Sequence, residues 1–368
     1  MGPTVAHISH TNLSHNINLI RKAVGSRKIM AIVKANAYGH GDLEVSRTAL
    51  EAGCEYLGVA FVEEGIKLRQ AGITHPVLLF GVHPCRDLIS AIDNNLEITI
   101  NSEKQVIDLQ NINTSKRKIS VHLHADTGMN CIGFHFEEFE KQYQRILKNT
   151  KLEIKGIFSH FSSAEESDRS FTDLQLSRFK EIKKYTESKS SHKILYHIAN
   201  SAAIMKLPES YFDMVRPGIM LYGQPPSPEF ALDWDLKEVL SFHSKLSSIN
   251  YLNKNEPLSY GRRFYTKEAT HIGVVPAGYA DGLDRRFTNN AEVIIRGEKY
   301  PLVGTVRMDM VMVNLGKDLK CEIGDDVILY GGDNSVKISI SEISEKLKTI
   351  PYEITCNLSS RVPRIHMY

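Results

Sequence analysis

Five side chains able to do chemistry lie at the ends of short apolar runs in this sequence. Lys34 closes KIMAIVK, His124 lies in KISVHLHA, His160 closes LEIKGIFSH, His197 lies in KILYHIA and Arg216 lies in FDMVRPG. Runs of this length and composition are typical of strands buried on both faces of a parallel sheet. The carboxyl ends of such strands meet at one edge. We therefore expect a lysine, three histidines and an arginine around a single site.

Lys34 is the residue with the most specific chemistry. The loops after the last two runs contain Ser201 and Gly218-Ile219, where a hydroxyl and backbone N–H groups can hold a phosphate. An amine beside a phosphate site predicts an imine with pyridoxal 5'-phosphate (PLP). The alternative is a lysine that only reaches solvent from the end of its strand. Tyr38 favours the first interpretation, because the turn after Lys34 can bring its phenol to the phosphate.

The elements that position these residues alternate regularly over the first two thirds of the chain. Eight apolar runs alternate with segments whose apolar residues recur at helical spacing. Eight such units predict a closed (β/α)8 TIM-like barrel. An open doubly wound sheet is the rival, but no run is followed by G-x-G-x-x-G. The predicted strands are 28–34, 56–60, 76–81, 96–100, 118–125, 152–160, 193–199 and 212–218.

The last third of the chain has consecutive apolar runs, turns between them and little helix. This pattern predicts a second, mostly antiparallel β domain over 236–368, after a barrel domain over 1–235. The joint is expected in the proline-rich and acidic segment 225–238. The predicted strands of the second domain are 271–279, 291–297, 300–316 and 325–332, and the capping-box spacing of Ser339 and Glu342 predicts one helix at 341–348.

Composition excludes several classes of partner. The chain has 368 residues, with 45 basic and 43 acidic side chains, so its formal net charge is +2. A nearly neutral surface does not attract nucleic acid or an anionic membrane. No apolar run is long enough to cross a bilayer, and the first residues do not form a secretory signal. Five scattered cysteines with no C-x-x-C predict no metal site and favour a reducing cytoplasm.

Several longer segments occur together with Lys34 in a fixed order. The segment AIVKANAYGHG (31–41) is similar to the cofactor-lysine signature of alanine racemases. Eight more segments resemble the same family, in family order and along almost the whole chain. They are HADTGMN (124–130), GIFSHFSSAE (156–165), HIANSAA (197–203), MVRPGIMLYG (214–223), LSYGRRF (258–264), PAGYADG (276–282), VGTVRMDM (303–310) and PYEITCNLSSRVPRI (351–365).

This resemblance implies a PLP enzyme with two bases. Lys34 would carry the cofactor and act as one base, and Tyr260 would act on the opposite face of the substrate α-carbon. Removal of a proton from one face and delivery to the other require two such groups. In this family the tyrosine comes from a second subunit, which implies a homodimer with shared sites. The implied reaction interconverts L- and D-alanine and supplies D-alanine for cell-wall peptidoglycan.

The resemblance also assigns binding roles. Arg216 would face the pyridine nitrogen of the cofactor, and His160 would pack against its ring. His197 and Asn200 would support Arg216. The other assigned residues are Tyr38, Ser201, Gly218, Ile219 and Tyr352 at the phosphate, Met308 and Asp309 at the substrate carboxylate, and Tyr279 and Arg285 at the substrate entrance.

Three positions depart from the family pattern. His124 stands where the family usually has a lysine, often carbamylated. Cys131 stands where it usually has an arginine that touches the cofactor oxygen and the substrate carboxylate. Arg307 replaces a small residue, commonly cysteine. Our hypothesis is that Arg307 returns a positive charge to the substrate site, which also contains Cys131.

Other interpretations stay open. A racemase acting on serine or another small amino acid, a related decarboxylase, or a PLP-binding homeostasis protein without turnover would share parts of this pattern. The SYG segment counts against the decarboxylase, and the second domain counts against the homeostasis protein. Among single residues, Tyr279 could be an aromatic packed between strands, His197 a core histidine and Asp126 a turn former. His40 and His122 are interpreted as structural.

Overall fold

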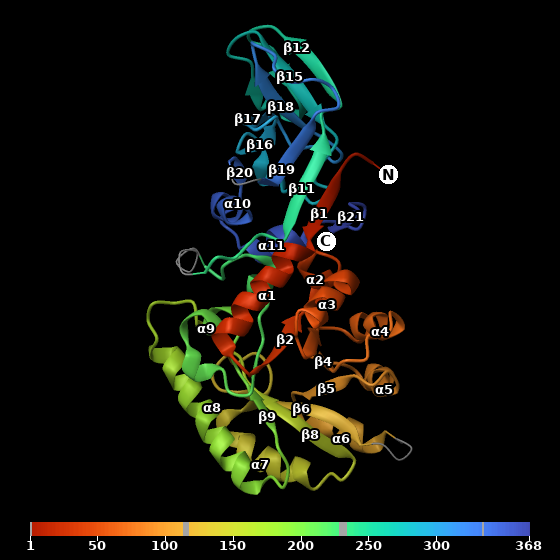
Figure 1. The fold of residues 1–368 in the computed structure, drawn as a ribbon, viewed down its shortest axis with the longest axis vertical. Coiled ribbons are helices and arrows are strands. Elements are labelled where there is room, and N and C mark those ends of the chain that lie inside the picture. Colours follow the sequence, from red (N-terminus) through yellow and green to blue (C-terminus); the bar gives the residue numbers. More distant parts are fainter. Residues whose placement is uncertain (1, 113–117, 228–233, 333–334) are drawn as a thin grey trace.

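A computed structural model describes residues 2–112, 118–227, 234–332 and 335–368. The chain forms a barrel of parallel strands with helices around it, in the lower part of Figure 1, and a mostly antiparallel β domain above it. The predicted fold class is therefore confirmed. The predicted joint at 225–238 includes residues 228–233, which lie outside the described residues. The domain limits at 235 and 236 stay a prediction.

The barrel contains the eight predicted strands, all parallel. Their order around the sheet is β10-β2-β3-β4-β5-β6-β8-β9, and β7 (Phe134–His135) adds a short pairing to β6. All residues of β3 and β4 are buried, because helices cover one face and the barrel interior covers the other. The strands are β2 (Lys28–Ile32), β3 (Tyr56–Val59), β4 (Val77–Leu79), β5 (Glu97–Ile100), β6 (Ile119–Asp126), β8 (Leu152–Phe158), β9 (Leu195–His197) and β10 (Met214–Val215).

Two backbone hydrogen bonds close the barrel between its last two strands. The N–H of Asp213 donates to the Tyr196 carbonyl over 3.0 Å, and the N–H of Arg216 donates to the Ala199 carbonyl over 2.9 Å. The open-sheet alternative is therefore wrong. The helices of the barrel are α1 (His10–Val24), α2 (Lys34–Tyr38), α3 (Asp42–Glu51), α4 (Val62–Gln70), α5 (Cys85–Asp93), α6 (Glu103–Asn111), α7 (Phe136–Leu147), α8 (Ser170–Lys189), α9 (Ser201–Lys206), and the 3-10 turns η1 (Pro208–Ser210) and η2 (Ile219–Tyr222).

The C-terminal domain is built on one large sheet in the order β12-β15-β18-β17-β16-β19-β11-β1-β21. The predicted apolar runs all form strands, and the run 300–316 is divided between β17 and β18. The strands are β11 (Leu240–Lys245), β12 (Ser248–Leu252), β15 (Thr270–Val275), β16 (Ala291–Ile295), β17 (Glu298–Val303), β18 (Val311–Gly316), β19 (Asp326–Gly332) and β21 (Arg364–Met367), with the short β13 (Pro257–Leu258), β14 (Phe264–Tyr265) and β20 (Lys337–Ile338).

Two helices and two 3-10 turns complete this domain. The predicted late helix is α10 (Ile340–Leu347), and both hydrogen bonds of its capping box are formed between Ser339 and Glu342. A second helix, α11 (Pro351–Cys356), was not predicted; it carries Tyr352 to the mouth of the barrel. The turns are η4 (Tyr260–Arg262) and η5 (Arg285–Phe287).

The first strand of the chain belongs to the second sheet. β1 (Val5–Ser9) pairs antiparallel with β11 and parallel with β21, which Figure 1 shows at the base of the upper sheet. Ser9 ends this strand and caps helix α1, because its hydroxyl accepts a hydrogen bond from the N–H of Asn12. The chain therefore passes directly from the C-terminal sheet into the barrel. No helix in the described parts of the chain has the length and apolarity to span a membrane.

Candidate active site

A cavity of about 700 Å³ lies at the carboxyl ends of the barrel strands, and α11 forms part of its wall. It brings together most of the barrel residues predicted for the site. Ile219 and His197 are fully buried and are not among the residues that line it. The predicted residues that line it are Lys34, Tyr38, His124, Cys131, His160, Asn200, Ser201, Arg216, Gly218 and Tyr352.

Lys34 is exposed at the cavity and begins an unusual turn. It was predicted to end its strand, but β2 ends at Ile32 and Lys34 is the first residue of α2. Residues 35–38 have φ of +53°, so this short helix is left-handed. That conformation costs roughly 1–2 kcal/mol for each residue other than glycine. The carboxylate of Glu64 helps to hold the turn, because one oxygen accepts the N–H of Ala35 over 2.6 Å.

Three segments of the barrel meet at the corner of the cavity where the phosphate was predicted, called the phosphate corner below, and they contribute Tyr38, Ser201 and Gly218. The hydroxyl of Ser201 accepts the N–H of Gly218 over 2.9 Å. A Cβ at Gly218 would lie 2.8 Å from the Tyr38 hydroxyl, so only glycine leaves this space open. Burial raises the pKa of Tyr38, and it raises the pKa of Tyr352 to about 12. Both phenols therefore stay protonated and can donate hydrogen bonds to an anion.

Asn200 has a different role from the one expected. Its side-chain oxygen accepts the N–H of Ala203 over 3.0 Å and caps α9. The structure has no hydrogen bond between the described Asn200 and Arg216 side chains. Asn200 therefore positions Ser201, the first residue of that helix, rather than the guanidinium.

Arg216 is a buried cation, and no carboxylate of the described residues forms an ion pair with it. Its Nη1 donates to the ring and the carbonyl of His197, each over 2.9 Å. Its Nη2 donates to the Ser159 carbonyl over 2.7 Å and contacts His160 Nδ1 at 3.1 Å. Burial lowers the pKa of Arg216 to about 9, which leaves it charged at neutral pH. The guanidinium is thus fixed at the cavity floor as a hydrogen-bond donor.

A chain of hydrogen bonds continues from Arg216 through the barrel interior. His197 Nε2 lies 2.9 Å from His122 Nδ1, and His122 Nε2 lies 2.8 Å from a carboxylate oxygen of Glu97. A guanidinium only donates, so each histidine accepts on Nδ1 and donates from Nε2. The chain of donors therefore runs from Arg216 to the carboxylate of Glu97. His122 was interpreted as structural and Glu97 was not predicted, because Glu97 lies at the start of β5, away from the cavity.

The remaining histidines of the cavity are neutral. Burial, with Arg216 nearby, lowers the pKa of His160 to about 3 and that of His124 to about 4. His124 Nδ1 lies 2.9 Å from the side-chain oxygen of Asn101, and its ring stacks on Phe158. The position at which the family usually has a lysine therefore carries no charge at neutral pH. Asp126 is buried and accepts the N–H groups of Gly128 and Asn130, as a turn former does.

Apart from Tyr352, the residues predicted from the C-terminal domain lie outside this cavity. Tyr260 is 67% exposed, in a turn fixed by reciprocal bonds between the 259–260 segment and Thr305. The guanidinium carbon of Arg307 lies 5.1 Å from the centre of the Tyr260 ring. Tyr279 is exposed and is not packed between strands, so that alternative is wrong. The other three, Arg285, Met308 and Asp309, are exposed as well.

Comparison with known proteins identifies the family. The N-terminal domain model of alanine racemases matches residues 8–226, and the C-terminal domain model matches residues 239–366. The chain belongs to the alanine racemase family. It is 40% identical over 369 residues to alanine racemase 2 of Caldanaerobacter subterraneus subsp. tengcongensis, covering 100% of this chain and 95% of that protein. Racemases are isomerases, so this family member is an enzyme of that class.

Solved structures of the family agree over the whole chain. The alanine racemase of Clostridium difficile 630 has a TM-score of 0.94 at 35% identity, covering 100% of this chain and 96% of that one. The alanine racemase of Bacillus anthracis with bound L-Ala-P has a TM-score of 0.93 at 34% identity, with the same coverage. The barrel and the β domain are therefore those of an alanine racemase.

Proposed function

We propose that this alanine racemase family member is a PLP-dependent racemase that interconverts L- and D-alanine in the cytoplasm and supplies D-alanine for peptidoglycan. The observation that carries the proposal is the cavity at the barrel mouth. It places the amine of Lys34 in the same space as the phosphate corner and the fixed guanidinium of Arg216. The L-Ala-P bound to the Bacillus anthracis relative supports alanine as the substrate.

The cavity has the groups that PLP requires. Ser201, Gly218 and the protonated phenols of Tyr38 and Tyr352 would hold the phosphate, with Ile219 following in the same loop. A phosphate oxygen would occupy the space that a Cβ at Gly218 would fill. Lys34 would form the covalent link, and Arg216 would meet the pyridine nitrogen. When bound, PLP supplies an electron sink for the electron pair that is left when the α-proton is removed.

The chain's own residues would move the proton. Lys34 Nζ would take or give it on one face of the α-carbon, and the Tyr260 hydroxyl would do so on the other. Tyr260 does not line the cavity of its own chain. It can therefore serve only the cavity of a second copy, which supports a homodimer with two shared sites. Met308, Asp309, Tyr279 and Arg285 would reach the second copy from the same part of the C-terminal domain.

Arg216 would control what happens to the carbanion. A guanidinium keeps its proton far more firmly than an imidazolium or a carboxylic acid does, so a ring nitrogen that accepts from it stays unprotonated. Less of the negative charge then spreads onto the ring, and return of the proton to the α-carbon is favoured. His160 and His197, both neutral, would orient Arg216 without adding charge.

A racemase of broader substrate range is the second candidate. It is favoured by Cys131 and the neutral His124, which replace two charged family residues at the cavity. The small side chain of Cys131 leaves more space near the substrate. Assays with L-serine beside L-alanine would rank the two substrates by kcat/KM.

The test is the absorbance spectrum of the purified protein with and without borohydride, followed by chiral analysis of alanine. We expect an absorbance band of bound PLP, reduction that fixes PLP to Lys34, and loss of optical activity from L-alanine. Release of CO2 would point to the decarboxylase. PLP fixed to Lys34 without any turnover would point to the homeostasis protein. A protein that binds no PLP would overturn the proposal.

A further inference from the structure

Arg307 is a cation that forms no ion pair with the described residues of its own chain. Among the ion pairs of the described residues, none includes Arg307. The nearest acidic residue in sequence, Asp309, is already paired with Arg361 over 2.9 Å, and Arg361 also lies 3.1 Å from Asp281. Among the described residues the Arg307 head group has two weak contacts, from Nη1 to the sulfur of Met310 at 3.3 Å and from the guanidinium to the ring of Tyr260. Its charge is therefore left for a ligand.

The backbone fixes Arg307 beside Tyr260. The N–H of Arg307 donates to the Met310 carbonyl over 3.1 Å, and its carbonyl accepts the N–H of Tyr279 over 3.0 Å. The guanidinium carbon lies 5.1 Å from the centre of the Tyr260 ring, within the range of a cation–π contact. If the Tyr260 phenol lies in the cavity of a second copy, the guanidinium of Arg307 therefore lies at that cavity as well.

The barrel cavity lacks the charge that Arg307 carries. Only two of the described residues that line it bear a permanent positive charge, Lys34 and Arg216. Both terminal nitrogens of Arg216 are bonded inside the protein, and Lys34 is committed to the cofactor in the proposed function. His124 and His160 are neutral at neutral pH. The carboxylate of an amino acid would therefore meet no available cation among these groups.

We propose that Arg307 of one subunit binds the α-carboxylate of the substrate in the cavity of the other subunit. The proposal rests on the proposed function, because it requires the shared sites that bring Tyr260 to the second copy. A guanidinium offers two parallel N–H donors to a carboxylate, which fixes the α-carbon as well as the charge. Substrate recognition and one of the two bases would then come from the same few residues of the C-terminal domain.

The test compares wild type, Arg307→Met and Arg307→Lys in the PLP-loaded protein. We expect Arg307→Met to raise the KM for L-alanine by roughly 10- to 100-fold, and Arg307→Lys by less, because lysine keeps the charge and loses the paired donors. Calorimetry with propionate, which has the carboxylate and no amine, should show the same loss of affinity. Binding of ethylamine, which has the amine and no carboxylate, should be unchanged.

Lys299→Met is the matched control, because Lys299 is an exposed cation elsewhere in the same domain. This variant should leave the affinities for propionate and ethylamine unchanged. Arg307→Gln replaces Arg307→Met if the latter does not form the wild-type oligomer. An equal loss of propionate and ethylamine affinity, or unchanged KM and propionate affinity in the neutral variant, would overturn the assignment. If wild type binds propionate through Arg307 and does not racemise alanine, the proposed function fails and this inference stands.

Discussion

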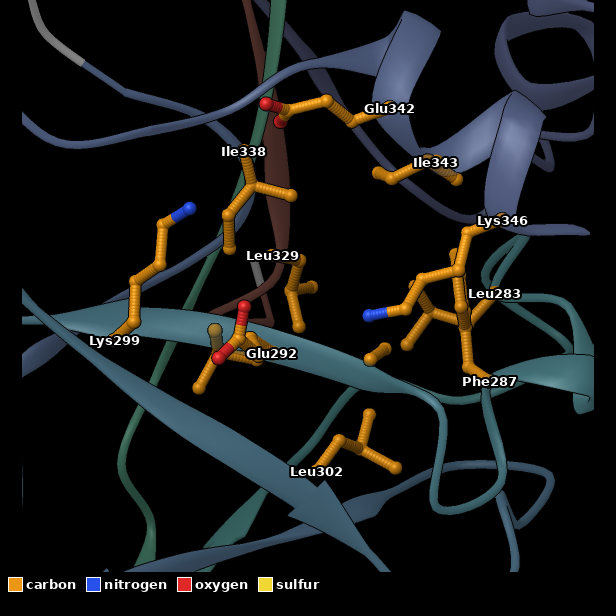
Figure 2. Close-up of a pocket in the computed structure, with 12 residues that line it drawn as sticks. Leu283, Phe287, Glu292, Lys299, Leu302, Leu329, Ile338, Glu342, Ile343 and Lys346 are labelled. Carbon is orange, nitrogen blue, oxygen red and sulfur yellow. The ribbon is translucent and has the colours of Figure 1, made fainter.

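The barrel cavity and a smaller hollow in the C-terminal domain differ in the side chains that line them. The barrel cavity collects an amine, a guanidinium, phenols and a hydroxyl from the ends of many strands. The second hollow, of about 220 Å³, lies in the C-terminal domain between α10 and the sheet (Figure 2). Its lining includes Leu283, Phe287, Leu302, Leu329 and Ile343, and its charged residues are Glu292, Lys299, Glu342 and Lys346.

The difference lies in how the polar groups are fixed. In the barrel cavity the polar atoms are oriented by hydrogen bonds, such as those that hold Arg216 and Ser201. The charged residues of the smaller hollow are the long side chains of a helix and of strands, which cover apolar surface with their stems. A space becomes a site when fixed polar groups converge on it. The smaller hollow is a packing gap under α10.

Complementation between inactive variants should give the largest effect. Lys34→Ala and Tyr260→Phe each remove one base, and each should lower kcat/KM by roughly 100-fold or more. If the site combines two subunits, coexpression of the two variants should restore about a quarter of the wild-type activity, because one site in each mixed dimer is intact. Activity of the mixture no higher than that of the separate variants would contradict shared sites.

A methyl group added in the barrel cavity should weaken PLP binding, whereas one added within the C-terminal sheet should affect only packing. Gly218→Ala would place a Cβ 2.8 Å from the Tyr38 hydroxyl, so we expect the Kd for PLP to rise about 10-fold or more. Gly273→Ala in β15 would press on Leu246 and Leu315, and should lower thermal stability while leaving PLP binding unchanged. Titration of the apo variants with PLP, with inorganic phosphate as competitor, measures PLP affinity, and thermal melting of the same variants measures stability. Equal PLP affinity in the two variants would remove Gly218 from the phosphate site.

Glu97→Gln tests whether the buried hydrogen bonds that join Arg216 to Glu97 contribute to catalysis. Glutamine keeps an acceptor for His122 and removes the charge at the end of the chain, so we expect kcat to fall about 10-fold with little change in KM. The pH profile of kcat should move as well, which a purely structural residue would not cause. Glu292→Gln, at the smaller hollow, is the control and should leave both quantities unchanged. If Glu97→Gln has the kcat and the pH profile of wild type, His197 alone is sufficient to orient Arg216.

Acid should lower the stability of the barrel, because its buried histidines take up protons more readily in the unfolded chain than in the folded one. Burial lowers the pKa of His40 and of His124 to about 4, from 6.5 in an unfolded chain. Between these values the unfolded chain binds more protons, so stability is complete above pH 6.5 and falls toward pH 4, by at most about 3 kcal/mol for each histidine. Urea unfolding at pH 7.5, 5.5 and 4.5 measures this slope, and His124→Asn should flatten it. A free energy of unfolding that rises on acidification would contradict this prediction.

The sequence predicts the barrel well because its signals are local. Each barrel strand is a short run of apolar residues, and the capping box of α10 involves two residues three apart. Long-range features were missed. Nothing in VAHIS reveals that β1 pairs with β11, more than 230 residues later. α11 was also missed, because a six-residue helix gives too short a periodicity.

In the candidate site, too, residues with a local sequence signal were predicted and those that depend on long-range contacts were missed. Lys34, Ser201, Arg216 and Gly218 were found because each lies in the last residues of a predicted strand or just after it. Glu97 was missed because it begins its strand and reaches Arg216 only through two histidines. The left-handed turn at 35–38 was missed because three of its residues are alanine or tyrosine, which rarely adopt positive φ.

The pairing of β1 with β21 has a consequence for how the protein is made. The first strand leaves the ribosome long before either of its neighbours in the sheet exists, so the nascent barrel carries an unpaired edge until β21 has been made. Until then, an exposed edge of this kind is a surface on which chaperones and other nascent chains can pair. Maturation of the enzyme therefore includes a late step in which β1 pairs with β21.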